Sequence, residues 1–118
     1  MSVSAEKIVN EIMKNMPHGA EKYLIPNGTG SLTLHIHWKL NNDPKRPNKY
    51  SKTIAIFISK ELMADFPKDP EFMHQYALSK ITAHIASRLK GFNPEHNAAR
   101  GVPEPVEEWN LPAEQLLG

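Results

Sequence analysis

Residues Ser31–Lys60, "SLTLHIHWKL NNDPKRPNKY SKTIAIFISK", decide the predicted fold because they hold two strand patterns separated by a proline-marked loop. In Leu32–Leu40 every second residue is apolar, which is the period of a strand with one buried face. Thr53–Ser59 repeats this pattern with three isoleucines on the core side, whereas Ala55 and Phe57 lie on the other side. The sequence therefore predicts a β-hairpin that supplies one wall of the core.

Two further elements are predicted before this hairpin. Ser4–Met16 has apolar residues three and four positions apart, as on one face of an amphipathic helix. Glu21–Ile25 is a short predicted strand, and the Asn27-Gly28 pair after it is a turn signal because both residues tolerate positive φ. These elements place a helix and an edge strand ahead of the hairpin.

A long helix is predicted after the hairpin, preceded by one or two helical turns in Lys60–Phe66. Asp69 is its predicted N-cap, Pro70 its first residue, and Gly91 ends it. The predicted buried residues share one helical face. They are Met73, Ala77, Leu78, Ile81, Ile85 and Leu89.

The order helix, three strands, helix predicts an α+β fold, a two-layer sandwich with a three-stranded antiparallel sheet. Both helices need the same apolar surface, so we expect them on one face of the sheet, with the other face open. The predicted domain is 1–92. Residues 93–118 are rich in proline and acidic side chains, and we expect an extended C-terminal arm there.

Composition sets limits on the class of protein. The chain has 118 residues, 40% hydrophobic and 23% charged, which suits one soluble domain. It has no cysteine, which rules out disulfides and thiolate metal sites. Neither a signal peptide nor a membrane span is evident, and we expect a cytoplasmic protein that does not contact membranes.

Charge is distributed unevenly although the net charge is only +1. Residues 39–60 carry six cations against Asp43, whereas residues 93–118 carry five glutamates against Arg100. Cations on a projecting β-ribbon can contact phosphates, and a tyrosine adds a ring for stacking. We therefore expect a nucleic-acid-binding hairpin, unless the loop is only a solvated connection. Its candidate residues are Lys39, Lys45, Arg46, Lys49, Tyr50 and Lys52.

The open face of the predicted sheet indicates an alternative function, a protein–protein interaction module such as an adaptor, chaperone or inhibitor. A broad, partly apolar face is rarely left exposed, so the arm, a second subunit or a ligand would cover it. We expect a homodimer, which an exchanged arm would also form. The candidate interface residues are His35, His37, Phe57, Trp109 and Leu111.

Catalytic and metal-binding patterns are weak. His35 and His37 point the same way on a strand, but a zinc site needs three or four protein ligands and only Asp43 lies near. Lys80, His84 and Arg88 form a basic ridge on the long helix, which is also what an ordinary solvated face would show. No nucleophile motif or phosphate-binding glycine loop occurs. We therefore expect a non-catalytic protein without a metal or cofactor.

Overall fold

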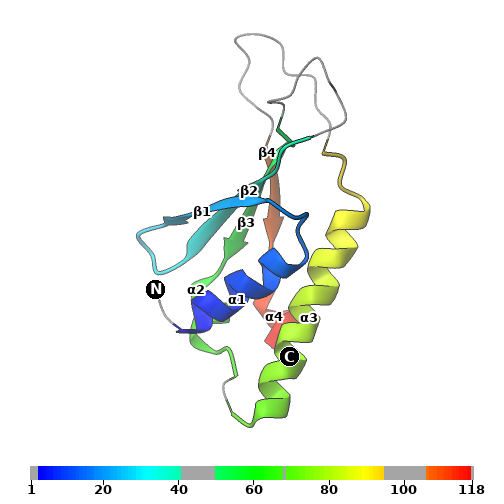
Figure 1. The fold of residues 1–118 in the computed structure, drawn as a ribbon. Coiled ribbons are helices and arrows are strands. Elements are labelled where there is room, and N and C mark those ends of the chain that lie inside the picture. The colour runs from blue at the N-terminus through cyan, green and yellow to red at the C-terminus, as the bar shows by residue number, and fades with distance from the viewer. Residues whose placement is uncertain (1–2, 41–49, 68, 95–105, 118) are drawn as a thin grey trace.

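The computed structural model describes residues 3–40, 50–67, 69–94 and 106–117, and it places the helices on one side of a single sheet (Figure 1). The elements in chain order are α1 (Val3–Lys14), β1 (Glu21–Pro26), β2 (Leu32–His37), β3 (Thr53–Ile58), α2 (Lys60–Ala64), α3 (Glu71–Lys90), β4 (Val106–Asn110) and α4 (Ala113–Leu117). The predicted α+β class is confirmed. None of these helices is long and apolar enough to cross a membrane.

The sheet has four strands in the order β1-β2-β3-β4. β2 is antiparallel to both β1 and β3, whereas β4 runs parallel to β3. Parallel neighbours require a long crossover, and α2 and α3 lie in that connection. The predicted three-stranded antiparallel sheet is therefore wrong in strand number and in the direction of one pair. The sequence of β4, "VEEWN", is short and does not alternate as β2 does. Trp109 is its only buried residue.

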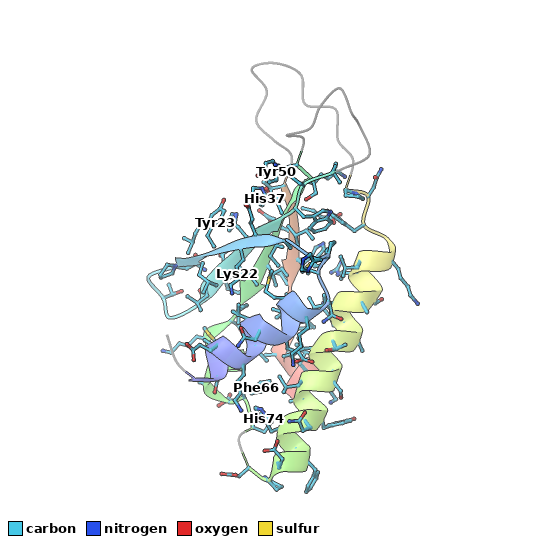
Figure 2. The ribbon with its side chains drawn as sticks, viewed as in Figure 1. Lys22, Tyr23, His37, Tyr50, Phe66 and His74 are labelled. Atoms are coloured by element: carbon cyan, nitrogen blue, oxygen red, sulfur yellow. The ribbon has the colours of Figure 1, made fainter. Side chains whose placement is uncertain are left out.

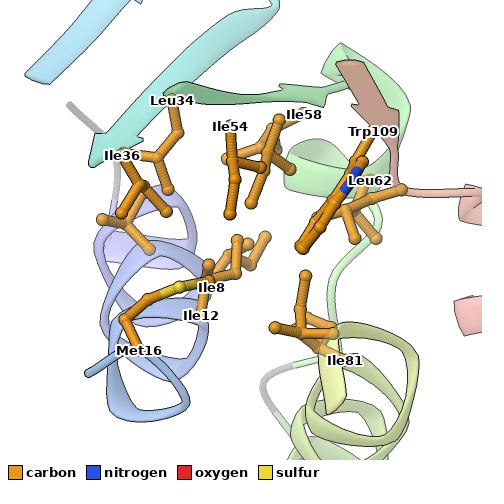
Figure 3. Close-up of a cluster of buried hydrophobic side chains, with 14 of the residues drawn as sticks. Ile8, Ile12, Met16, Leu34, Ile36, Ile54, Ile58, Leu62, Ile81 and Trp109 are labelled. Atoms are coloured by element: carbon orange, nitrogen blue, oxygen red, sulfur yellow. The ribbon is translucent and has the colours of Figure 1, made fainter. Parts of the chain in front are cut away.

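The hydrophobic core lies between the sheet and the helices (Figure 3). Ile56 on β3 pairs with Leu34 on β2 and with Trp109 on β4, so three strands meet in one layer. Ile8 and Ile12 of α1 lie below this layer and are completely buried. Each such side chain contributes about 1.5–3 kcal/mol through removal from water. The predicted buried faces of the first helix and of the central hairpin are confirmed.

The turn between β1 and β2 is longer than a two-residue hairpin loop. Pro26 pairs with Leu32, so five residues connect the strands. Gly28 and Gly30 have positive φ, whereas no residue other than glycine among those described does. The predicted turn at Asn27-Gly28 is present, but Asn27 does not adopt the left-handed conformation.

Helix α3 begins one residue later than predicted and buries a different side chain near its start. Pro70 is the N-cap, without a side-chain cap bond, in place of Asp69. His74 is buried and Met73 is 41% exposed. Both nitrogens of the buried imidazole have a polar partner. Nδ1–H donates to the Pro67 carbonyl (2.8 Å), and Nε2 lies 3.3 Å from the Lys7 ammonium, which can donate to it. An apolar pattern alone favours methionine over histidine, which explains the wrong assignment.

The last part of the chain belongs to the same core as the rest. Trp109, Leu111 and Leu116 are each at most 5% exposed. The Trp109 ring contacts Phe92 edge to face at 5.9 Å between centroids. The predicted extended arm is therefore corrected for residues 106–117, which form a strand and a helix, while residues 95–105 lie outside the described part.

Candidate functional site

The face of the sheet opposite the helices is not covered by any described helix (Figure 1). The register aligns Tyr23 of β1 with His35 of β2, and His35 with Ala55 of β3. Ile25, Thr33 and Phe57 form the next row. We call this surface the outer face. Large apolar side chains on it are exposed, namely Tyr23 (54%), Ile25 (41%), Phe57 (40%) and Val106 (50%).

Two ring stacks stand side by side along β2 on the outer face. The Tyr23 and His35 rings lie 4.9 Å apart between centroids, at an interplanar angle of 19°. The His37 and Tyr50 rings lie 4.5 Å apart at 21°. Figure 2 shows Tyr23, His37 and Tyr50 on the side of the sheet away from α1. Because i and i+2 residues of a strand share a face, β2 presents both histidines together.

Backbone and side-chain bonds beyond the end of β2 hold Tyr50 in place. Ser51 N–H donates to the Trp38 carbonyl (2.8 Å), and its hydroxyl accepts from the Trp38 N–H (3.1 Å). Lys39 and Tyr50 then form an antiparallel bridge. Ser51 is fully buried, so this clamp is shielded from water. The hairpin therefore continues past β2 and β3 and sets the Tyr50 ring against His37.

His37 is also bonded to the neighbouring strand. Its Nε2 lies 3.0 Å from a carboxylate oxygen of Glu21, which pairs with His37 in the ladder. Among the described residues no group of three or more metal-binding side chains occurs. His35 therefore stacks on Tyr23, while His37 stacks on Tyr50 and is hydrogen-bonded to the Glu21 carboxylate.

The predicted nucleic-acid-binding residues fall into two groups. Lys39 is exposed, and Tyr50 and Lys52 are partly buried at the base of the loop. The other three, Lys45, Arg46 and Lys49, lie in residues 41–49, outside the described part. Of the described members, Tyr50 belongs to the His37–Tyr50 stack, and Lys39 pairs with Tyr50 in an isolated bridge.

The predicted interface residues are not one surface. His35, His37 and Phe57 lie on the outer face, as the alternation of β2 and β3 predicts. Trp109 (2% exposed) and Leu111 (3%) are buried in the core. Trp109 Nε1–H donates to Glu107 at 3.0 Å, so its polar atom is also engaged. The expectation that these two residues recognise a partner is corrected, because the fold itself buries them.

A shallow hollow of about 200 Å³ lies on the outer face beside the Tyr23–His35 stack, because one of its lining residues, Ala55, pairs with His35. Phe57 and Glu108 are among its lining residues, together with Thr33, Ala55, Trp109 and Asn110. The register places Glu108 in the same row as His35 and Ala55, at the β4 edge of the sheet. The outer face therefore has a cationic end at Lys39 and Tyr50, an apolar end at Ile25 and Phe57, and an acidic residue at the β4 edge between them.

Sequence reasoning missed Tyr23, Ile25 and Val106 as surface residues. Tyr23 and Ile25 lie two positions apart in a strand of which only Leu24 is even partly buried. Two large apolar residues at this spacing on a predicted edge strand were the sequence signal that could have identified the exposed pair. Val106 could not be placed because its strand was not predicted.

His84, from the basic ridge of α3, is partly buried near the end of β4. Desolvation and the positive charge of Arg88 lower its pKa, against a backbone hydrogen bond at Asn110 that raises it. Its Nε2 has no hydrogen-bond partner among the described residues. Folding therefore favours the neutral form of this histidine.

The lowered pKa of His84 predicts a loss of stability in acid. Below the ordinary value of 6.5, the unfolded chain binds a proton at this histidine before the folded chain does. The free energy of unfolding is then unaffected above that pH and falls as the pH drops toward the folded pKa. Denaturant unfolding at several pH values should show a steeper acidic loss in wild type than in His84→Gln. Equal acid dependence of the two proteins would contradict this assignment.

Compared with known proteins, the chain matches no family model, no curated protein and no solved structure.

Proposed function

We propose that the protein is a small non-catalytic binding module for single-stranded nucleic acid. Bases stack on the rings at the cationic end of the outer face, and the cations of hairpin 39–60 contact the phosphates. The observation that carries this proposal is the pair of ring stacks, Tyr23–His35 and His37–Tyr50, at the base of the most basic segment.

Exposed rings favour a single strand over a duplex. A base can stack on a protein ring only when it is unpaired or splayed out of its own helix. Each such contact is worth about 1–3 kcal/mol and is tolerant of sequence, because every base has a π-face. Tyr23 is 54% exposed while its ring rests on His35, so one side of the stack is open to a base.

The distribution of charge also favours binding at the end of the outer face that carries Lys39 and Tyr50. Lys39 is exposed beside Tyr50, and residues 39–60 carry six cations against one acid. Glu21 would oppose a phosphate unless His37, whose Nε2 lies 3.0 Å from its carboxylate, is protonated and pairs with it. Glu108 at the opposite edge repels phosphates, so we expect the strand to follow β1 and β2.

A salt titration tests this proposal. Wild type should bind random single-stranded DNA more tightly than duplex DNA, at micromolar protein and about 50 mM salt. Its affinity should fall as the salt concentration rises. The variant Lys45→Ala, Arg46→Ala, Lys49→Ala should keep its fold, because none of these residues belongs to an apolar strand face. Its slope of log affinity against log salt should be shallower by about 0.7 for each single-strand phosphate that is no longer neutralised.

The charge control is Lys14→Ala on α1, which should leave the slope unchanged. Fluorescence anisotropy with labelled DNA reads all of these affinities. Absence of binding by wild type at low salt would contradict the proposal. An unchanged slope of log affinity against log salt in the triple variant would contradict it as well.

A second candidate function, a protein interaction module, is favoured by the other end of the outer face. Phe57 exposes apolar surface and lines the hollow, which has room for a side chain of a partner. Such binding would depend little on salt and would be lost in Phe57→Ser. A complex that survives high salt and needs Phe57 but not the hairpin cations would favour this second function.

A further inference from the structure

Helix α3 exposes a second unusual surface on the side away from the core. His74, Ala77, Ile81 and Ile85 are its buried residues. On the opposite side, residues recur at alternating intervals of four and three, the spacing of a helix–helix seam. We call them the outward face of α3: Phe72, Tyr76, Ser79, Ala83 and Ala86, all of them exposed.

The outward face lacks the charges that a solvent-facing helix surface normally carries. Phe72 is 70% exposed and Tyr76 is 57% exposed, with Met73 beside them at 41%. The Lys80 ammonium lies 4.6 Å from the centroid of the Tyr76 ring and covers only part of it. Rings grouped in this way on an exposed helix are typical of an interaction surface.

We propose that the outward face of α3 binds the same face of a second copy of this chain, with the two helices antiparallel about a two-fold axis near Ser79. Residues at nearly equal distances from Ser79 along the sequence then face each other. Phe72 of one copy meets Ala86 of the other, and Tyr76 meets Ala83. Large side chains thus oppose small ones at both ends, so the helices can approach closely without leaving voids.

Charges at the two ends of α3 favour the same arrangement. Glu71 lies in its first turn and Lys90 in its last turn, both exposed, and Lys90 is one turn beyond Ala86 on the same side of the helix. In an antiparallel pair, each Glu71 lies near the basic end of the other copy, and the helix dipoles oppose each other. A parallel pair would instead place like charges together and leave Ala86 facing Ala86. The pattern is therefore self-complementary for a second copy in one orientation.

The proposed dimer leaves the outer face of the sheet free in both copies, because the outward face of α3 points away from the sheet. It also requires no exchange of β4, which completes the sheet of its own chain. The homodimer expected from the sequence is thereby assigned to α3, and this assignment is independent of any nucleic-acid binding.

Charge variants at the axis test the dimer. Ser79→Glu places two like charges at the axis, and Ser79→Lys does the same with the opposite sign. Sedimentation equilibrium should give a dimer for wild type and a monomer for each variant, with unchanged circular dichroism. Mixing the two variants should restore the dimer as a heterodimer. Asn10→Glu, on the exposed side of α1, is the control and should remain dimeric.

Introduced cysteines test the orientation, since the chain has none of its own. Ser79→Cys should cross-link to itself on oxidation. Phe72→Cys and Ala86→Cys should cross-link only when the two variants are mixed. A wild type that is monomeric at high concentration, a dimeric Ser79→Glu, or a self-linked Ala86→Cys variant would each overturn the proposal.

Discussion

The Trp109→Ala variant is expected to lose about 3–5 kcal/mol of unfolding free energy, the usual cost of removing a buried tryptophan ring. Trp109 is 2% exposed, pairs with Ile56 across β3 and β4, and contacts Phe92 edge to face. Domains of this size have about 5–15 kcal/mol of stability in all, so the loss would be a large fraction of the total. Urea denaturation followed by circular dichroism measures it.

Val106→Thr on the same strand is the matched control. Val106 is 50% exposed, so this change should alter stability by about 0.5 kcal/mol or less. If Trp109→Ala unfolded at the same urea concentration as wild type, residues 106–110 would not form a structural strand. The four-stranded sheet would then be wrong.

The second large effect concerns the ring stacks. The double variant Tyr23→Ala, Tyr50→Ala is expected to lose about 1–3 kcal/mol of binding free energy for each base that stacks there. Loss of two stacked bases would therefore lower the affinity for single-stranded DNA by about 30-fold to more than ten-thousandfold. Fluorescence anisotropy at fixed salt measures this change separately from that of the hairpin cations.

The rescue variant Tyr23→Phe, Tyr50→Phe keeps both rings and should keep most of the affinity. Circular dichroism should show that both double variants remain folded, because Tyr23 is on an edge strand and 54% exposed. Equal affinity of the alanine and phenylalanine variants would contradict a stacking role for these tyrosines.

Periodicity was sufficient to predict most of the fold. α1, β2, β3 and α3 each have an apolar repeat that most of their buried residues follow, although Thr53 and Ala55 on the outer side of β3 are buried too. β4 could not be predicted in this way, because a five-residue strand with a single buried tryptophan has no repeat. His74 was missed for a related reason, since its burial depends on the Pro67 carbonyl, which no pattern in α3 indicates.

The candidate site was predictable only in part. The alternation of β2 placed His35 and His37 on the outer face, and Phe57 followed from β3. Their partners Tyr23 and Tyr50 depend on the cross-strand register and on the Ser51 clamp, which are properties of the folded chain. Trp109 was wrongly predicted to lie at an interface. An aromatic residue in an acidic, proline-rich segment resembles a recognition motif until its strand is known.

Titration of the isotopically labelled protein with a short random single-stranded DNA, followed by NMR, tests the proposed binding surface most directly. Resonances of Tyr23, His35, His37 and Tyr50 are expected to shift together, and these shifts are expected to reverse when salt is raised. Resonances of the buried residues of α1 should stay unchanged. Shifts confined to the helices, or no shifts at a large excess of DNA, would contradict the assignment of the outer face as a nucleic-acid site.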